Sequence, residues 1–304
     1  MIKVLTNDGL QQDAIDNLKR LGMEVINYHY DKEELKNILK DFDVITIRSA
    51  TKIDSDILDS LTDESKLKLI IRAGVGVDNI DVSYAKKLGI EVRNTPNASS
   101  DSVAELAIAH MFSVARFLAD SNFTMRVGSW NKKEYEGIEL SGKTLGIIGM
   151  GRIGRSLAKK ASAIGMNVVY YTIEGKYNDL TYKFESLEEL LRTSDFISLH
   201  VPYDKQIGSI IGKSQFEMMK DGVYLINCAR GKVVDEDALL EALDSGKVAG
   251  AGIDVFEQEP TLNKKLINHK RVSVTPHIGA STKEAQDRIA NEVVNTIKDF
   301  FSIK

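Results

Sequence analysis

The sequence has 304 residues, of which 43% are hydrophobic and 28% charged, and its formal net charge is −4. These values are typical of a soluble globular protein of two domains, and they argue against a nucleic-acid-binding protein. No apolar run is long enough to span a bilayer, and the N-terminus does not resemble a signal peptide. Since the single cysteine, Cys228, cannot form an internal disulfide, we expect a cytoplasmic protein that acts on small molecules.

The first third of the chain alternates between strand-like and helical patterns. Strands are predicted for IKVLT, MEVIN, DVITI, LKLII and IEVR, and helices for residues 10–21, 32–40, 55–61 and 82–88. This alternation predicts an α/β unit with a parallel sheet that is covered by helices on both faces.

Cationic loops follow two of these strands. RSATK (48–52) follows DVITI, and RAGVGVDN (72–79) follows LKLII. Open α/β sheets bind ligands at the carboxyl ends of their strands. Either loop alone would be most simply explained as a solvated turn, but the two together favour an anionic substrate.

A long helix is predicted after residue 97. Ser102 and Glu105 have the spacing of a capping box, and an apolar face follows them. His110 lies on that face, where a hydrogen-bonded core histidine is a simpler explanation than a ligand-binding one. Residues 122–142 are polar and are predicted to form a connecting arm.

From Lys143 the alternation resumes. Strands are predicted in TLGIIG, NVVYYT, DFISLHVP, GVYLINCARG, VAGAGIDVF and RVSVTPHIGA, and an amphipathic helix at 284–301 ends the chain. The first strand runs into Gly149, Gly151 and Gly154. Their spacing alone also fits a structural turn, but a strand before them and a helix after them favour a dinucleotide site, because phosphates bind at a helix N-terminus.

Three chemically useful side chains follow later strands of this unit. Arg230 offers a planar fork for a carboxylate, His277 is a natural acid/base near neutral pH, and Glu259 could pair with His277 and favour its protonated form. Each alone could be an ordinary surface residue. Together they suit the reduction of a 2-oxo acid. Cys228 is better explained as a small buried residue than as a nucleophile.

The motifs IGMGRIG, INCARGKVVDEDAL, AGIDVFEQEP and TPHIGAST, in this order, resemble the D-isomer-specific 2-hydroxyacid dehydrogenase family along nearly the whole chain. The resemblance implies two doubly wound parallel-sheet domains with a cleft between them. One is a flavodoxin-like substrate domain (1–97 plus 286–304), and the other is a Rossmann cofactor domain (98–285). It also implies a homodimer formed through the cofactor domain. No C-terminal regulatory module and no metal site are expected.

The resemblance also implies roles for individual residues. Catalysis is expected from Arg230, Glu259 and His277. Substrate contacts are expected at Arg48, Ser49, Lys52, Arg72, Gly74, Val75, Gly76, Arg230 and His277. Cofactor contacts are expected at Gly149, Gly151, Arg152, Ile153, Gly154, Thr172, His200, Val201, Pro202, Cys228, Ala229, Arg230, Asp254, His277 and Gly279, with Asp254 facing the nicotinamide carboxamide.

Two positions depart from the family pattern. Thr172 stands where many NAD-dependent members have an acid that binds the ribose hydroxyls, and the nearest acid is Glu174. The threonine removes a charge that would repel the 2′-phosphate of NADP, but no arginine at position 172 or 173 attracts one. NAD is therefore the expected cofactor and NADP the alternative. Asp204 replaces a common threonine, which affects the expected adenosine contacts.

Within the family, RSATK, RAGVGVDNID and NTPNASSDSVAEL resemble members that act on 3-phosphoglycerate. The implied reaction is hydride transfer from its C2 hydroxyl to NAD, which gives 3-phosphohydroxypyruvate for serine biosynthesis. One alternative is a reductase of hydroxypyruvate, glyoxylate or pyruvate. An alternative of another class is a non-catalytic NADH-sensing protein similar to transcriptional corepressors.

Overall fold

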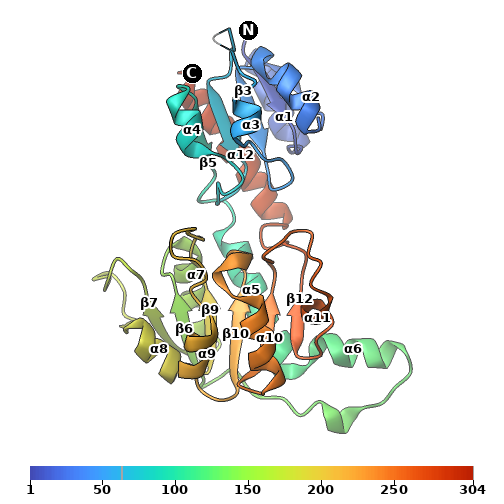
Figure 1. Ribbon diagram of the computed structural model, residues 1–304, viewed down its shortest axis with the longest axis vertical. Coiled ribbons are helices and arrows are strands. Elements are labelled where there is room, and N and C mark those ends of the chain that lie inside the picture. The colour runs from blue at the N-terminus through green and yellow to red at the C-terminus, as the bar shows by residue number, and fades with distance from the viewer. Residues whose placement is uncertain (63, 304) are drawn as a thin grey trace. The chain divides into compact units, whose positions relative to one another are not determined.

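The computed structural model of the protein describes residues 1–62 and 64–303 (Figure 1). The chain divides into two compact units, residues 1–99 with 280–304, and residues 100–279. The boundaries expected from the sequence were 97/98 and 285/286. They differ because Ala98 and Ala280, on either side of the second unit, both pack in the core of the first unit.

The first unit contains a parallel sheet of order β2-β1-β3-β4-β5. Its strands are β1 (Lys3–Thr6), β2 (Glu24–Ile26), β3 (Val44–Ile47), β4 (Leu69–Arg72) and β5 (Glu91–Asn94). Its helices are α1 (Gln12–Arg20), α2 (Lys32–Ile38), η1 (Leu39–Asp41), α3 (Ser55–Leu58), α4 (Val82–Lys87) and α12 (Lys283–Phe300). This is the expected doubly wound, flavodoxin-like order.

Successive residues of the central strands enter two different cores, which explains why these strands are apolar throughout. On β3, Val44 belongs to the core under α1 and α12, whereas Ile45 and Ile47 belong to the core under α2, α3 and α4. The C-terminal helix α12 places Val293 and Ile297 in the first of these cores, so its apolar stripe has the partner surface that the sequence required.

The strand order of this sheet reverses at β1, which pairs with both β2 and β3. Connections diverge at such a point, and the loops after β1 and β3 are left to form a crevice. Those loops carry Asp8 and Arg48, respectively.

The second unit contains a parallel sheet of order β12-β11-β10-β9-β6-β7-β8. Its strands are β6 (Thr144–Ile148), β7 (Asn167–Tyr171), β8 (Lys183–Phe184), β9 (Phe196–Leu199), β10 (Val223–Asn227), β11 (Val248–Ile253) and β12 (Val272–Val274). Its helical segments are α5 (Ser100–Arg116), α6 (Leu118–Arg126), η2 (Lys132–Glu134), α7 (Arg152–Ala163), α8 (Leu187–Thr193), α9 (Lys213–Met218), η3 (Gly231–Val233), α10 (Glu236–Asp244) and α11 (Lys264–Ile267). Its order reverses between β6 and β9, as in a dinucleotide-binding fold.

Helix α5 packs closely on β11 because that strand presents glycines to it. A Cβ built on Gly252 would lie 2.5 Å from the Cβ of His110, and one on Gly250 would lie 3.1 Å from the Cβ of Val114. The run VAGAGI is therefore a strand whose small residues accept a helix.

Several expected elements differ in detail. Helix α5 begins at Ser100, so Ser102 is a buried residue of its first turn, and the prediction that Ser102 caps the helix was wrong. The expected polar arm at 122–142 begins inside helix α6 instead. Strand β8 and helix α11, of two and four residues, were not predicted because so few residues carry no periodicity.

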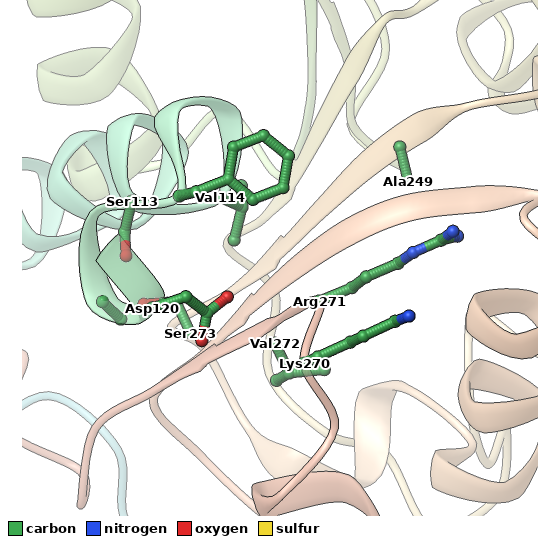
Figure 2. Close-up of a pocket in the computed structure, with 10 residues that line it drawn as sticks. Ser113, Val114, Asp120, Ala249, Lys270, Arg271, Val272 and Ser273 are labelled. Carbon is green, nitrogen blue, oxygen red and sulfur yellow. The ribbon is translucent and has the colours of Figure 1, made fainter. Parts of the chain in front are cut away.

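Where α5 meets α6, the two helices face β11 and β12. A cavity of about 20 Å³ lies there, lined by Val114, Asp120, Arg271 and Ser273 among others (Figure 2). Burial raises the pKa of Asp120. In the described part of the chain, no single helix is long and apolar enough to cross a membrane; the bent pair α5 and α6 passes that test only by length and composition.

Candidate active site

The glycine turn after β6 has the shape that a dinucleotide requires. Gly149 has a φ of +98°, and a Cβ there would collide with the carbonyl oxygen of His200. A Cβ on Gly154 would collide with the carbonyl of Gly149, whereas Gly151 faces open space. The backbone is thus tight where it packs on the protein and open where a ligand would approach.

Helix α7 begins at this turn with Arg152 and Ile153, and no side chain among the residues that the structure describes caps its N-terminus at Gly151. Its first backbone amides are therefore not bonded by a capping side chain. Uncapped amides and the positive end of the helix dipole suit a phosphate group. These residues fit a dinucleotide cofactor.

Thr172, which is expected to contact the ribose, lies beside this turn. The preceding residue, Tyr171, accepts a hydrogen bond from Gly149 N at 2.8 Å through its carbonyl oxygen. Thr172 is buried and its hydroxyl donates to the carboxylate of Glu174. The hydrogen bond from Thr172 lowers the pKa of Glu174. An ionised carboxylate therefore lies at the end of β7, two residues beyond its usual place.

The loops after β10 and β11 lie against each other. A Cβ on Gly231 would collide with the carbonyl group of Phe256, so only glycine permits this approach. Arg230, just before that glycine, is half-buried, and its Nη1 donates to Ala229 O at 2.6 Å. Its charge acts on Glu259 of the facing loop.

Glu259 and His277 form a close pair. Glu259 Oε2 lies 2.6 Å from His277 Nδ1, and the two side chains are 35% and 33% exposed. Burial raises the pKa of Glu259, but the hydrogen bond and charge of His277, the amide of Phe256 and the charge of Arg230 more than offset this, so the pKa lies below its usual range. The carboxylate is thus ionised and oriented toward the imidazole, and the predicted pairing of Glu259 with His277 is confirmed.

Asp254 holds the turn that carries His277. Its carboxylate is buried and accepts from the Thr275 hydroxyl at 2.5 Å, from Ile278 N at 2.8 Å and from Gly279 N at 2.9 Å. Its carbonyl accepts from His277 N at 2.8 Å. The expected nicotinamide contact stays a prediction, and in this structure the carboxylate binds the loop itself.

The remaining expected cofactor residues lie beside the glycine turn or at the end of β10. Cys228 and Ala229 are buried, and burial raises the pKa of Cys228, which suits an inert thiol. Burial lowers the pKa of His200 to about 4, so this imidazole is neutral, and its Nε2 lies 2.9 Å from Ser198 Oγ. Val201 packs against Gly149, and Pro202 is exposed beside it.

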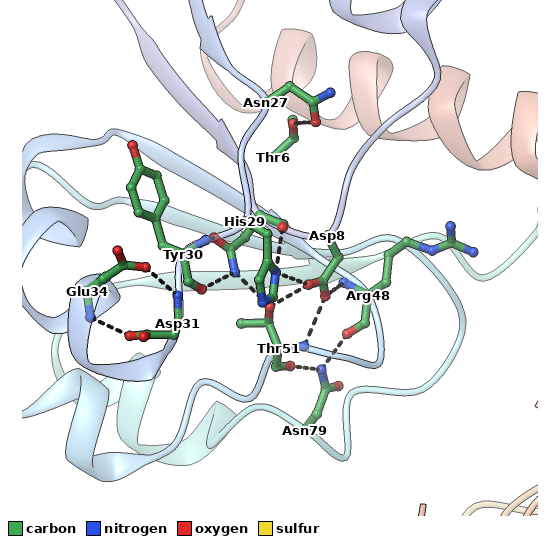
Figure 3. Close-up of polar contacts among 11 residues, drawn as sticks. Thr6, Asp8, Asn27, His29, Tyr30, Asp31, Glu34, Arg48, Thr51 and Asn79 are labelled. Atoms are coloured by element: carbon green, nitrogen blue, oxygen red, sulfur yellow. Dashed lines mark hydrogen bonds and ion pairs between the residues drawn. The ribbon is translucent and has the colours of Figure 1, made fainter. Parts of the chain in front are cut away.

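In the first unit, the loop of residues 48–52 is held by a buried carboxylate that the sequence did not reveal (Figure 3). Asp8 accepts from Arg48 N at 2.6 Å, from Thr51 N at 3.1 Å and from the Thr51 hydroxyl at 2.6 Å. Asn79 donates its amide to the carbonyls of Arg48 and Thr51, at 2.6 Å each. The loop after β3 is therefore held by residues that follow β1 and β4.

The side chains of this loop that are expected to bind substrate face outward from that anchor. Arg48 lines a pocket of about 240 Å³ together with Asp8, Gln11 and Gln286. Ser49 and Lys52 are exposed. Neither Arg48 nor Lys52 forms an ion pair within residues 1–62 and 64–303.

The second cationic loop, after β4, lies next to the first because Ile47 and Arg72 are register partners. Gly74 has a φ of +154°, and a Cβ there would collide with the guanidinium of Arg72. Asn94 donates to the carbonyl of Val75, and Gly76 follows with partial exposure. The two predicted substrate loops are therefore adjacent.

The comparisons with known proteins agree with this geometry. A family model described as "D-isomer specific 2-hydroxyacid dehydrogenase, NAD binding domain" matches residues 108–279. The chain is 46% identical over 299 residues to a hydroxypyruvate reductase of Thermotoga maritima, with 97% of each chain covered.

It is also 44% identical to a D-3-phosphoglycerate dehydrogenase of Methanocaldococcus jannaschii, covering 98% of this chain but 57% of that one. The chain thus spans little more than half the length of that relative. Among solved structures, D-lactate dehydrogenase of Aquifex aeolicus, complexed with NAD and lactic acid, superimposes with a TM-score of 0.85 at 35% identity, covering 99% and 95% of the two chains. The chain therefore belongs to the D-isomer-specific 2-hydroxyacid dehydrogenase family of NAD(P)-dependent oxidoreductases.

Proposed function

We propose that this protein oxidises D-3-phosphoglycerate at its C2 hydroxyl with NAD, which gives 3-phosphohydroxypyruvate and supplies serine biosynthesis in the cytoplasm. The main support for a phosphorylated substrate is the pair of cationic side chains on the loop after β3. Arg48 and Lys52 face outward, and Asp8 binds the backbone amides of Arg48 and Thr51 without forming an ion pair with either cationic side chain. Such a loop suits a substrate with a second anionic group besides its carboxylate.

The second unit supplies the redox chemistry. Bound NAD would accept a hydride from C2. Neutral His277 takes the hydroxyl proton on Nε2, because its Nδ1 faces Glu259. Glu259 then stabilises the imidazolium, and Arg230 holds the substrate carboxylate with its planar fork.

We infer NAD rather than NADP from Glu174. A carboxylate at the end of β7 accepts hydrogen bonds from ribose hydroxyls and repels a 2′-phosphate. Arg155 of α7 lies nearby, but it pairs with Asp179 at 2.5 Å and covers the ring of Tyr177. The loop after β7 also carries the exposed Lys176. Its positive charge would attract the 2′-phosphate of NADP, whereas the negative charge of Glu174 would repel it.

A second candidate substrate is hydroxypyruvate. The observation that favours it is the Thermotoga maritima relative, a hydroxypyruvate reductase that matches over 97% of its length. The two substrates share the carboxylate and carbonyl that Arg230 and His277 would bind and differ in the phosphate. The cationic loop is therefore where they are distinguished.

We also propose a homodimer through the second unit. Apolar side chains cluster on and after α6, where Phe123 is 67%, Val127 62% and Trp130 77% exposed. A surface of this kind suits burial against another copy. Light scattering of the purified protein tests this, and a mass of one chain at micromolar concentration would contradict it.

The assay that tests the function follows NADH loss with four substrates at equal concentrations, namely 3-phosphohydroxypyruvate, hydroxypyruvate, glyoxylate and pyruvate. We expect the highest kcat/KM for the phosphorylated substrate. A higher value for hydroxypyruvate would replace the proposal with the second candidate. Turnover of none would favour the non-catalytic NADH-sensing alternative.

A further inference from the structure

A buried histidine outside the active-site chemistry is connected to the active-site turn. His110 of α5 is 2% exposed. Its Nδ1 lies 3.0 Å from Ser273 Oγ and its Nε2 lies 3.0 Å from Thr275 Oγ1. The Thr275 hydroxyl in turn lies 2.5 Å from Asp254 Oδ1. These contacts confirm the prediction of a hydrogen-bonded core histidine, and they also link it to the turn that carries His277.

The proton positions in this chain follow from the donors available. An ionised Asp254 can only accept, so the one hydroxyl proton of Thr275 points to it. Thr275 must then accept from His110 Nε2–H. Burial lowers the pKa of His110, against the opposing charge of Asp254, so the imidazole is neutral and its Nδ1 accepts from Ser273. The chain therefore runs in one direction, Ser273 to His110 to Thr275 to Asp254.

The receiving carboxylate has a geometric task. Asp254 Oδ1 also accepts from Ile278 N and Oδ2 accepts from Gly279 N. Between these residues and Thr275, His277 has a φ of +53°, in the left-handed region that a histidine seldom adopts. The direction of the His277 imidazole thus depends on hydrogen bonds to Asp254.

The fold provides room for this arrangement. A Cβ on Gly252 would lie within 3 Å of the Cβ and Cγ of His110, and one on Gly279 would lie 3.2 Å from Asp254 Oδ2. Gly252 therefore leaves space for the imidazole of His110, and Gly279 leaves space for the carboxylate of Asp254. An apolar side chain at position 110 would fill the same space without supplying the donor.

We propose that His110 is a positioning residue of the dehydrogenase, which fixes Asp254 through Thr275 and thereby holds His277 in its reactive orientation. The proposal rests on the proposed acid/base role of His277 but not on the identity of the substrate. It predicts that the chemical step suffers more than cofactor or substrate binding, because His110 acts on the His277 turn only through Thr275 and Asp254.

The test compares His110→Met, which keeps the volume without the donor, with His110→Gln, which restores an N–H donor. Met111→Leu, a buried apolar exchange on the same helix, is the matched control. The readouts are kcat and KM with the best substrate, the Kd of NADH from fluorescence titration, and Tm. We expect His110→Met to lower kcat about tenfold, because small misplacements of reacting groups are costly, with KM and Kd within about twofold. His110→Gln should recover most of kcat.

Thr275→Val removes the middle of the chain and tests the link if a variant at 110 fails to fold. It should lower kcat at least as much as His110→Met, and the double variant should be no worse than Thr275→Val alone. Unchanged kcat in both single variants, additive losses, or a Gln variant no better than the Met variant at equal Tm would overturn the proposal. If the proposed acid/base role of His277 is itself wrong, His277→Ala will keep full turnover, which distinguishes that outcome from a failure of the His110 proposal.

Discussion

His277 Nδ1 and Glu259 Oε2 lie 2.6 Å apart, on loops that follow the neighbouring strands β12 and β11. Since the pKa of Glu259 is held below its usual range, the carboxylate accepts from Nδ1–H at neutral pH. Nε2 of the imidazole faces away from this carboxylate, as the proposed proton exchange with the substrate requires.

The first prediction concerns the pH dependence of this pair. Oxidation needs a neutral imidazole, and Glu259 stabilises the charged form. In Glu259→Gln the imidazolium loses that stabilisation, so the acid limb of the oxidation rate should move to lower pH. The reduction rate at neutral pH should fall, because it needs the imidazolium. Rate profiles in both directions measure this, and an unmoved acid limb would contradict the pairing.

Glu259 itself has a depressed pKa in the folded protein, so its ionisation adds stability above its unfolded pKa that is lost as pH falls through the folded value. Denaturation of Glu259→Gln beside the parent protein separates this effect from catalysis. The rate profile should change at pH values where both proteins are fully folded.

Replacement of His277 tests the acid/base directly. His277→Ala removes the group that takes the hydroxyl proton, so turnover should fall by a factor on the order of 10² or more. NADH should still bind, because the glycine turn and α7 are untouched. The measurement is kcat together with the Kd of NADH. Turnover equal to that of the parent would rule out the assigned role.

Lys52 distinguishes the substrates. Lys52→Ala should raise KM for 3-phosphohydroxypyruvate by about tenfold or more and change that for hydroxypyruvate little, because only the first carries a phosphate. Lys68→Ala is the matched control, since this exposed lysine precedes β4 at the opposite edge of the same sheet. Equal effects of Lys52→Ala on both substrates would remove the support for phosphate binding.

The parts of the site that the sequence predicted are local ones. The turn at Gly149 to Gly154 and the strand ends before Arg230 and His277 follow from short patterns, and the resemblance to the family added Asp254. Because the strands are parallel, their carboxyl ends lie at one edge of the sheet, so the sequence pattern alone predicts that these residues lie near one another.

The parts that it did not predict depend on distant pairs. Asp8 and Thr51 are 43 residues apart, and His110 and Thr275 are 165 apart. Asp8 in TNDG looked like an ordinary turn residue, and nothing nearby marked it as an anchor. The exchange of an acid at 172 for one at 174 was visible, but the hydrogen bond that fixes Glu174 was not.

The anchor gives a further prediction. Asp8→Asn keeps the size of the side chain but leaves one acceptor oxygen for the amides of Arg48 and Thr51 and the hydroxyl of Thr51. The loop should loosen, which raises KM for the phosphorylated substrate about tenfold and costs about 1–3 kcal/mol of stability. Asp13→Asn, on the exposed side of α1, is the control. Unchanged KM and unfolding free energy would show that Asp8 does not hold the loop.

The last prediction concerns the cofactor. Glu174→Gln removes the charge that repels a 2′-phosphate, so the ratio of the NADPH to the NADH Kd should fall about tenfold. Thr172→Val should act in the same direction but less, since it frees the carboxylate without removing it. Glu188→Gln, an exposed acid of α8, is the control. Calorimetric titration of each protein with both cofactors gives the ratio independently of turnover. If the parent protein binds NADPH more tightly than NADH, Lys176 outweighs Glu174, and Lys176→Ala should then restore the preference for NADH.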